Sequence, residues 1–212
     1  MIDRLARSQG ALLAARAAAL AEPGRRYLLG IAGGPAAGKS TLAADLAQAL
    51  GPQTAVVVPL DGFHLAQSVL AERQLTAVKG ALETFDLAGF LHLLRRLRGP
   101  TDEVVYAPTF RRELEEPIAG AIAVPPAVPL VIVEGNYLLV EDAGWGQVRP
   151  LLDQVWFLAP PEDLRTDRLI ARHRSFGRDE ASARARAAGS DQANADIIGP
   201  SGKRADVLIT GG

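Results

Sequence analysis

Short apolar runs alternate along the chain with longer stretches in which apolar residues recur at helical spacing. The runs are short enough to be buried strands, and they span residues 26–32, 54–60, 130–134, 155–158 and 207–210, with a further candidate at 103–107. Helices are predicted at 39–50, 86–97, 162–174 and 181–188, and a polar, helical stretch is expected to run to about residue 79. Strands alternating with helices predict an α/β fold, with a mainly parallel central sheet covered by helices on both faces.

The first 24 residues are predicted to form an N-terminal helix, because Leu5, Leu12, Leu13 and Leu20 recur near helical spacing and the pattern ends at residues 23–24 (Pro-Gly). A signal peptide is the alternative, but Arg16 interrupts its apolar run. No apolar stretch approaches the ~20 residues that span a bilayer. We therefore expect a cytoplasmic protein without a membrane partner. No repeat or linker divides the chain, so residues 1–212 are expected to form one domain.

Composition excludes several classes of protein. The 212 residues include no cysteine, which rules out a disulfide scaffold, thiolate-bound zinc, an iron–sulfur cluster and a thiol nucleophile. The net charge is −1 and no basic patch with interleaved aromatic residues is found, so a nucleic-acid partner is not expected. Lysine is rare: only Lys39, Lys79 and Lys203 occur. One of these three stands in a recognisable motif.

That motif is a phosphate-binding loop, since residues 33–40 (GGPAAGKS) fit the pattern G-x-x-x-x-G-K-[ST] between a predicted strand and a predicted helix. Lys39 would reach the β- and γ-phosphates of a nucleoside triphosphate, and the Ser40 hydroxyl would bind Mg²⁺. A glycine-rich turn without a ligand is the alternative. The predicted nucleotide-binding residues are Gly33, Gly34, Pro35, Ala36, Ala37, Gly38, Lys39, Ser40 and Thr41.

Two acidic residues follow predicted strands, at the sheet edge where ligands of α/β proteins bind. Asp61 could accept a proton from an attacking hydroxyl or help to hold Mg²⁺, or it could belong to an ordinary Asp-Gly turn. Glu134 ends a run typical of a Walker B strand and would order a water on Mg²⁺, or it could simply end the strand. Near them, His64 could bind the acceptor or cap the next helix. Two further residues, Asn136 and Tyr137, could face an acceptor pocket or be turn and core residues.

The segments GGPAAGKST, PLDGFH and VIVEGNYLL together resemble the P-loop kinase family of uridine kinases, phosphoribulokinases and bacterial pantothenate kinases. The resemblance is greatest to its small branch of fructose transport system kinases, or nucleoside-kinase-like proteins. It extends to ETFD (83–86), APTFRRELEEP (107–117), RLIARH (168–173) and ADVLI (205–209), and so covers about residues 27–210. It implies a P-loop NTPase fold, a three-layer α/β/α sandwich, with a small helical lid at about 165–190.

The resemblance also implies roles for single residues. Asp61 matches the general base towards the acceptor hydroxyl, and Arg112 matches an arginine that reaches the acceptor pocket from the loop after the third strand. Arg168 and Arg172 match lid arginines that close over the phosphates, although arginines on this helix could instead form surface ion pairs. Arg174 and Arg178 are expected at the surface. Arg111 stands where the family commonly has aspartate, so acceptor contacts from this loop are expected to differ.

These features predict an ATP- and Mg²⁺-dependent kinase that phosphorylates a hydroxyl of a small polar metabolite, with a sugar such as fructose as the leading candidate. A nucleoside or pantothenate kinase and an ATP-dependent regulatory NTPase are the alternatives. A GTPase switch is disfavoured, because neither Lys79 nor Lys203 stands in an N/T-K-x-D motif. The oligomeric state stays open, with a homodimer as one option.

Overall fold

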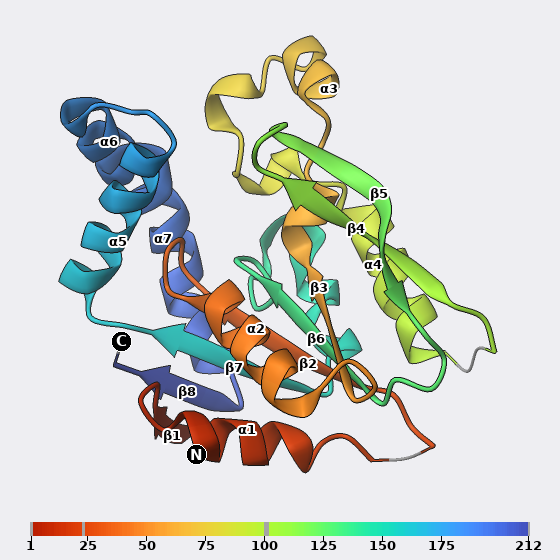
Figure 1. Cartoon of the computed structure of the whole chain (residues 1–212). Coiled ribbons are helices and arrows are strands. Elements are labelled where there is room, and N and C mark those ends of the chain that lie inside the picture. The colour runs from red at the N-terminus through yellow and green to blue at the C-terminus, as the bar shows by residue number, and fades with distance from the viewer. Residues whose placement is uncertain (1, 23, 100–101, 212) are drawn as a thin grey trace.

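Six parallel strands form the central sheet, in the order β1-β8-β7-β2-β6-β3 (Figure 1). This computed structural model describes residues 2–22, 24–99 and 102–211. The strands are β1 (Asp3–Ala6), β2 (Tyr27–Gly33), β3 (Ala55–Pro59), β6 (Leu130–Gly135), β7 (Gln154–Ala159) and β8 (Val207–Thr210). Because all six run in one direction, their carboxyl ends meet at a single edge, and the phosphate-binding loop follows the central strand β2.

Successive residues of the central strands point to opposite faces of the sheet and enter two separate cores. On β6, Val131 and Val133 pack in the core that contains helix α4 (Leu87–Arg98), whereas Ile132 packs in the core that contains α1 (Gly10–Ala18) and α2 (Lys39–Leu50). The sheet is thus sandwiched between helices, which confirms the predicted α/β/α architecture. Helix α4 also has the predicted start: the Asp86 carboxylate accepts a hydrogen bond from the Gly89 backbone amide at 2.8 Å.

The predicted helix over the first 24 residues is wrong in its first turns. Residues Asp3–Ala6 form β1, which pairs with β8 in parallel, so that Leu5 lies beside Ile209. The helix α1 begins only at Gly10. The hydrogen bonds that β1 gains at the sheet edge come from residues some two hundred positions away, and they override a local helical pattern.

A second departure is a two-stranded antiparallel sheet, formed by β4 (Val105–Arg111) and β5 (Glu116–Val124). The predicted strand at 103–107 is the beginning of β4, but its partner β5 was not predicted. Residues 118–124 of β5 (IAGAIAV) are apolar, but four of the seven are Ala or Gly, which favour strands only weakly, and most of the strand is exposed. The turn after β4 carries Arg112, whose guanidinium pairs with the carboxylate of Asp61 just beyond β3.

The predicted lid region corresponds to three helical segments that stand above the sheet edge, across from the hairpin and α3 (Figure 1). They are α5 (Glu162–Ser175), α6 (Glu180–Arg186) and α7 (Gln192–Ile198), with a π-helical turn at Ala187–Asp191. The polar stretch after β3 is only partly helical, because α3 (Gln67–Glu72) is short. The described 3-10 helices are Leu60–Phe63, Thr76–Val78, Leu82–Thr84, Asp142–Gln147, Arg149–Leu151 and Gly199–Arg204. Within the described residues, no helix is long and apolar enough to span a membrane.

Candidate active site

The loop between β2 and α2 has a backbone that requires glycine at its two ends. Gly33 has φ +150°, and a Cβ atom there would lie 2.8 Å from the carbonyl oxygen of Leu158. Gly38 has φ +96°, in the left-handed region. The intervening backbone folds around Lys39, whose ammonium donates to the Gly34 carbonyl oxygen at 2.9 Å. The predicted loop therefore exists as a preformed cradle, with its lysine side chain inside.

Lys39 and Glu134 are both buried beneath this loop. Burial lowers the pKa of Lys39 to about 8, against the attraction of Glu134 and Asp61. The pKa of Glu134 is raised to about 7, chiefly by burial and also by the nearby Asp61, while Lys39 and a hydrogen bond from Ser40 oppose the rise. The Ser40 hydroxyl donates to the Glu134 carboxylate at 3.2 Å. Burial removes water from the ammonium and from the carboxylate, and this disfavours the charged form of each group. A bound ligand of opposite charge would offset that cost.

A hydroxyl and a carboxylate side by side are hard oxygen donors, which suit Mg²⁺. This ion usually keeps several waters and takes only one or two protein ligands besides substrate phosphates. No group of three or more His, Asp or Glu side chains that could hold a metal by themselves occurs in the described part of the chain. Ser40 and Glu134 therefore fit a Mg²⁺ ion that is bound together with a nucleotide.

Asp61 lies two residues after β3, in the 3-10 helix Leu60–Phe63, and its side chain reaches the turn of the hairpin. Its carboxylate lies 3.2 Å from the guanidinium of Arg112, and both side chains remain partly exposed. Nearby, His64 has Nδ1 2.8 Å from the Asp61 carbonyl oxygen, and its ring lies against those of Phe85 and Phe110, with centroids 4.0 and 5.0 Å away. Burial lowers the pKa of His64, so the ring is neutral at pH 7.

His64 does not cap the next helix, which was one of its two predicted roles. The first backbone amide of α3, that of Gln67, donates instead to both carboxylate oxygens of Glu116, at 3.1 Å each. Glu116 comes from the start of β5, so this cap depends on the hairpin that the sequence pattern did not reveal. His64 instead lines the wall of a cavity beside Asp61.

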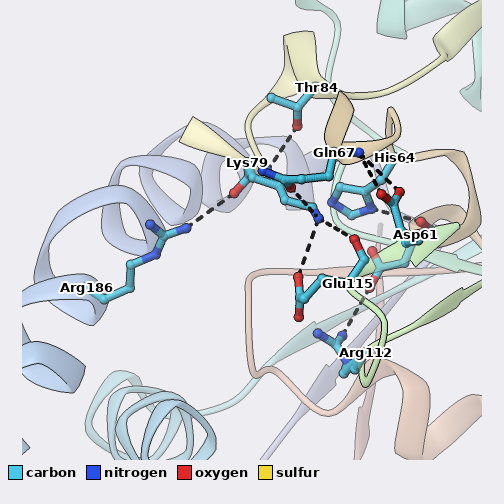
Figure 2. A network of polar contacts seen from close by, with 10 residues as sticks. Asp61, His64, Gln67, Lys79, Thr84, Arg112, Glu115 and Arg186 are labelled. Atoms are coloured by element: carbon cyan, nitrogen blue, oxygen red, sulfur yellow. Dashed lines mark hydrogen bonds and ion pairs between the residues drawn. The ribbon is translucent and has the colours of Figure 1, made fainter. Parts of the chain in front are cut away.

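Figure 2 shows a network around Lys79 that joins the segment after α3, the hairpin turn and the lid. The Lys79 ammonium donates to the Glu115 carbonyl oxygen at 2.7 Å and to the Gln67 side chain at 3.3 Å, and it lies 5.1 Å from the centre of the Phe110 ring. Arg186 of α6 donates to the Lys79 carbonyl oxygen at 3.4 Å. Sequence reasoning assigned no role to these residues. The scarcity of lysine was the one available signal for Lys79.

Asn136 and Tyr137 follow β6, and their side chains lie in different environments. Asn136 lines the cavity beside Asp61, as predicted for an acceptor pocket. Tyr137 is fully buried, its ring packs against Phe85 and Trp145, and its hydroxyl donates to the Gly80 carbonyl oxygen at 2.6 Å. Tyr137 is therefore a core residue, which was the alternative to its predicted contact with the substrate.

The arginines of α5 and its surroundings have different environments. Arg172 is half-buried and faces the cavity beside Asp61, where burial and the nearby Arg112 lower its pKa. Arg168 is exposed and borders the phosphate-binding loop. Arg174 forms an exposed pair with Glu180 at 3.1 Å, as expected for a surface residue. Arg178 is exposed as well, as expected, and it also borders the cavity beside Asp61.

Arg165 is buried at the base of α5, although arginines of this helix could have formed only surface ion pairs. Its guanidinium donates to Glu162 at 2.9 Å, to the Gln192 side chain of α7 at 2.8 Å and to the Pro35 carbonyl oxygen at 3.3 Å. Because Pro35 belongs to the phosphate-binding loop, Arg165 connects that loop to two lid helices. Its helix position alone gave no sign of this contact.

Two cavities lie on opposite sides of the loop. The inner cavity, of about 240 Å³, is bordered by Asp61, His64, Lys79 and Arg112, and it reaches the lid. The outer cavity, of about 560 Å³, runs along residues 36–41 to Arg168 and to residues outside the predicted site: Arg7, Ser8 and Gly211. Three residues border both cavities, namely Lys39, Ser40 and Arg172.

Comparison with known proteins places this chain among P-loop kinases. No family model matches the sequence. A relative from Schizosaccharomyces pombe, named "Putative uridine kinase C227.14", is 36% identical over 166 residues, which make up 74% of this chain and 71% of that protein. A solved structure titled as a "putative fructose transport system kinase" from Silicibacter sp. TM1040 is 39% identical, with a TM-score of 0.80 over 93% of this chain and 98% of the other. Phosphoribulokinase from Rhodobacter spheroides, 15% identical with a TM-score of 0.61 over 88% and 70% of the two chains, shares the fold alone.

Proposed function

Because the chain belongs to the P-loop kinase family of uridine kinases, pantothenate kinases and phosphoribulokinases, we propose that it transfers the γ-phosphate of ATP to a hydroxyl group of a small polar metabolite. The observation that carries the proposal is that two cavities meet at Lys39, Ser40 and Arg172. A triphosphate bound along residues 36–41 would have its end at this junction. An acceptor in the inner cavity would then face the γ-phosphate directly.

In the proposed reaction, the acceptor hydroxyl gives its proton to the Asp61 carboxylate while its oxygen forms a bond to the γ-phosphorus. The bond between that phosphorus and the β–γ bridging oxygen breaks, so the products are a phosphate ester and ADP. Lys39, Arg168 and Arg172 would hold the charge of the transferring group, as is general for this chemistry. Ser40 and Glu134 would hold Mg²⁺, which neutralises phosphate charge when bound.

The inner cavity supports a small acceptor with several polar groups. Its volume of about 240 Å³ lies below the roughly 300–1,000 Å³ of pockets for drug-sized ligands. Its wall offers hydrogen-bonding groups of both kinds, among them Asn136, Asn194 and Arg112. These features favour a sugar such as fructose over a nucleoside, the bulkier of the alternatives.

The test is ATP consumption by the purified protein with Mg²⁺, measured with and without a panel of sugars, nucleosides and pantothenate. We expect one acceptor to raise consumption well above the background and to be recovered with an added phosphate. Asp61→Asn serves as the inactive control. Slow hydrolysis that no acceptor in the panel changes would contradict the proposal and favour an ATP-dependent regulatory protein.

A further inference from the structure

The outer cavity extends past the phosphate-binding loop to the carboxyl ends of the edge strand β1 and of its neighbour β8. Its wall there consists of Arg7 and Ser8, which follow β1, and of Gly211, which follows β8. Arg168 of α5 borders the same space. If the loop holds a triphosphate, as the proposed function requires, this part of the cavity lies where the sugar and base beyond the phosphates must go.

Arg7 is held in place at both its backbone and its side chain. Its backbone amide donates to the Thr210 carbonyl oxygen at 2.8 Å, which continues the pairing of β1 with β8. Its guanidinium lies 2.5 Å from the carboxylate of Asp45, one turn after Thr41 on helix α2. With its side chain only 22% exposed, Arg7 is ordered on the wall of the cavity before any ligand binds.

The chemistry of this wall suits a base better than a phosphate. The charge of Arg7 is already paired with a carboxylate, whereas the planar face of a guanidinium can still stack on an aromatic ring. The Ser8 hydroxyl can both donate and accept a hydrogen bond, and in the described part of the chain no residue makes a hydrogen bond with it. A flat, hydrogen-bonding ligand is what these two residues can recognise.

We propose that Arg7 and Ser8 form the subsite for the nucleobase and ribose of the bound nucleotide, an inference that rests on the proposed function. The N-terminal strand β1 then contributes directly to the nucleotide site, in addition to extending the sheet. Arg7 would lie along one face of the base, and Ser8 would bind its edge or the ribose.

The experiment compares two ligands by calorimetry, each with Mg²⁺ and without an acceptor: ATP, and inorganic tripolyphosphate, which lacks a base and a ribose. The unaltered protein should bind ATP more tightly than tripolyphosphate. Arg7→Ala should weaken ATP binding about tenfold, as expected for the loss of a desolvated stacking contact. Its affinity for tripolyphosphate should stay within about twofold of the original.

A matched control is Arg16→Ala, because Arg16 forms a similar pair with Asp3 at 2.6 Å on the same segment but does not border the outer cavity. It should leave both affinities unchanged. If Arg7→Ala does not fold, Arg7→Lys keeps the charge opposite Asp45 but removes the planar face, and it should show the same loss for ATP alone.

Four results would overturn the inference. They are an equal loss for both ligands in the Arg7 variants, no loss for either ligand, a loss of ATP binding of the same size in Arg16→Ala, and equal affinities of the unaltered protein for ATP and tripolyphosphate. If the unaltered protein binds neither ligand, the proposed function fails along with the inference. Failure of the base subsite alone is therefore distinguishable from failure of the nucleotide site.

Discussion

The carboxylate of Asp61 and the guanidinium of Arg112 lie 3.2 Å apart, although 51 positions separate them in the chain. Asp61 comes from the end of β3 and Arg112 from the tip of the β4–β5 hairpin, and their side chains are 32% and 45% exposed. A pair this open contributes only about 0–1 kcal/mol to stability. A ligand can therefore replace it at little cost, which suits two residues that must contact an incoming acceptor.

We expect Asp61→Asn to lower turnover by roughly 10²- to 10⁴-fold, since the amide cannot accept the hydroxyl proton. ATP binding and the melting temperature should change little, because Asp61 is partly exposed and its ion pair with Arg112 is open to solvent. Turnover with the acceptor found in the panel, and ATP binding by calorimetry, are the measurements. Unchanged turnover would return Asp61 to the role of a turn residue.

Lys39→Met should abolish turnover and yet raise the free energy of unfolding at pH 7. Burial lowers the pKa of Lys39 to about 8, so the folded protein carries the cost of a buried ammonium at every pH below 8. This cost declines as pH rises from about 8 towards the ordinary value of 10.5, where the unfolded chain also loses its proton. In urea unfolding, the gain in free energy of unfolding of Lys39→Met over the unaltered protein should therefore become smaller above pH 8. A variant that is less stable than the original at pH 7 would contradict this account.

Glu134 should make the protein less stable as pH rises from about 4.5 to about 7. The folded state holds the proton up to a pKa of about 7, whereas the unfolded chain releases it near 4.5. The loss should be on the order of 3 kcal/mol, with no further change from this group above pH 7. Glu134→Gln, which cannot ionise, should lack this part of the pH dependence in urea unfolding. The same slope in both proteins would show that another group is responsible.

Arg165→Met should lower the free energy of unfolding by roughly 2–3 kcal/mol, because it leaves the buried Pro35 carbonyl and the Gln192 side chain without their donor. The matched control is Arg174→Met on the same helix, which removes only an exposed pair and should cost less than about 0.5 kcal/mol. Chemical denaturation of both variants tests the difference. Equal losses would mean that Arg165 acts as a surface residue.

Tyr137→Phe should cost about 1 kcal/mol of stability, the net value of one hydrogen bond, and leave the KM for the acceptor unchanged. Asn136→Ala should instead raise the KM for the acceptor and leave stability nearly unchanged, because Asn136 lines the inner cavity. Denaturation and steady-state kinetics on both variants separate the two neighbours. A raised KM in Tyr137→Phe would restore its predicted contact with the substrate.

The sequence was most informative where a function depends on a short segment at the end of a buried strand. Lys39, Ser40, Asp61 and Glu134 could be placed together because the carboxyl ends of parallel strands meet at one edge. The contact between Lys79 and Arg186 could not be foreseen, because it joins residues 107 positions apart and neither belongs to a local motif.

The helix predicted at the position of the edge strand β1 was wrong for a related reason. Its residues have helical spacing, and only pairing with β8 turns them into a strand. As a result, no role could be predicted for Arg7 and Ser8, which the fold brings to the outer cavity. Patterns of hydrophobic residues predict which segments are buried, but not which distant segment will lie beside an edge.

The anchoring of Arg165 divides the lid into a fixed part and a hinged part. The base of α5 is tied through Arg165 to the phosphate-binding loop and to α7, so neither end of the lid can swing away without breaking buried hydrogen bonds. Between them, Gly177 has φ +87° and Gly189 interrupts the helical backbone, which leaves α6 bounded by a pivot on each side. Arg178 and Arg186 lie on that segment. A rotation of this short flap alone would open the inner cavity and leave the nucleotide side of the site in place.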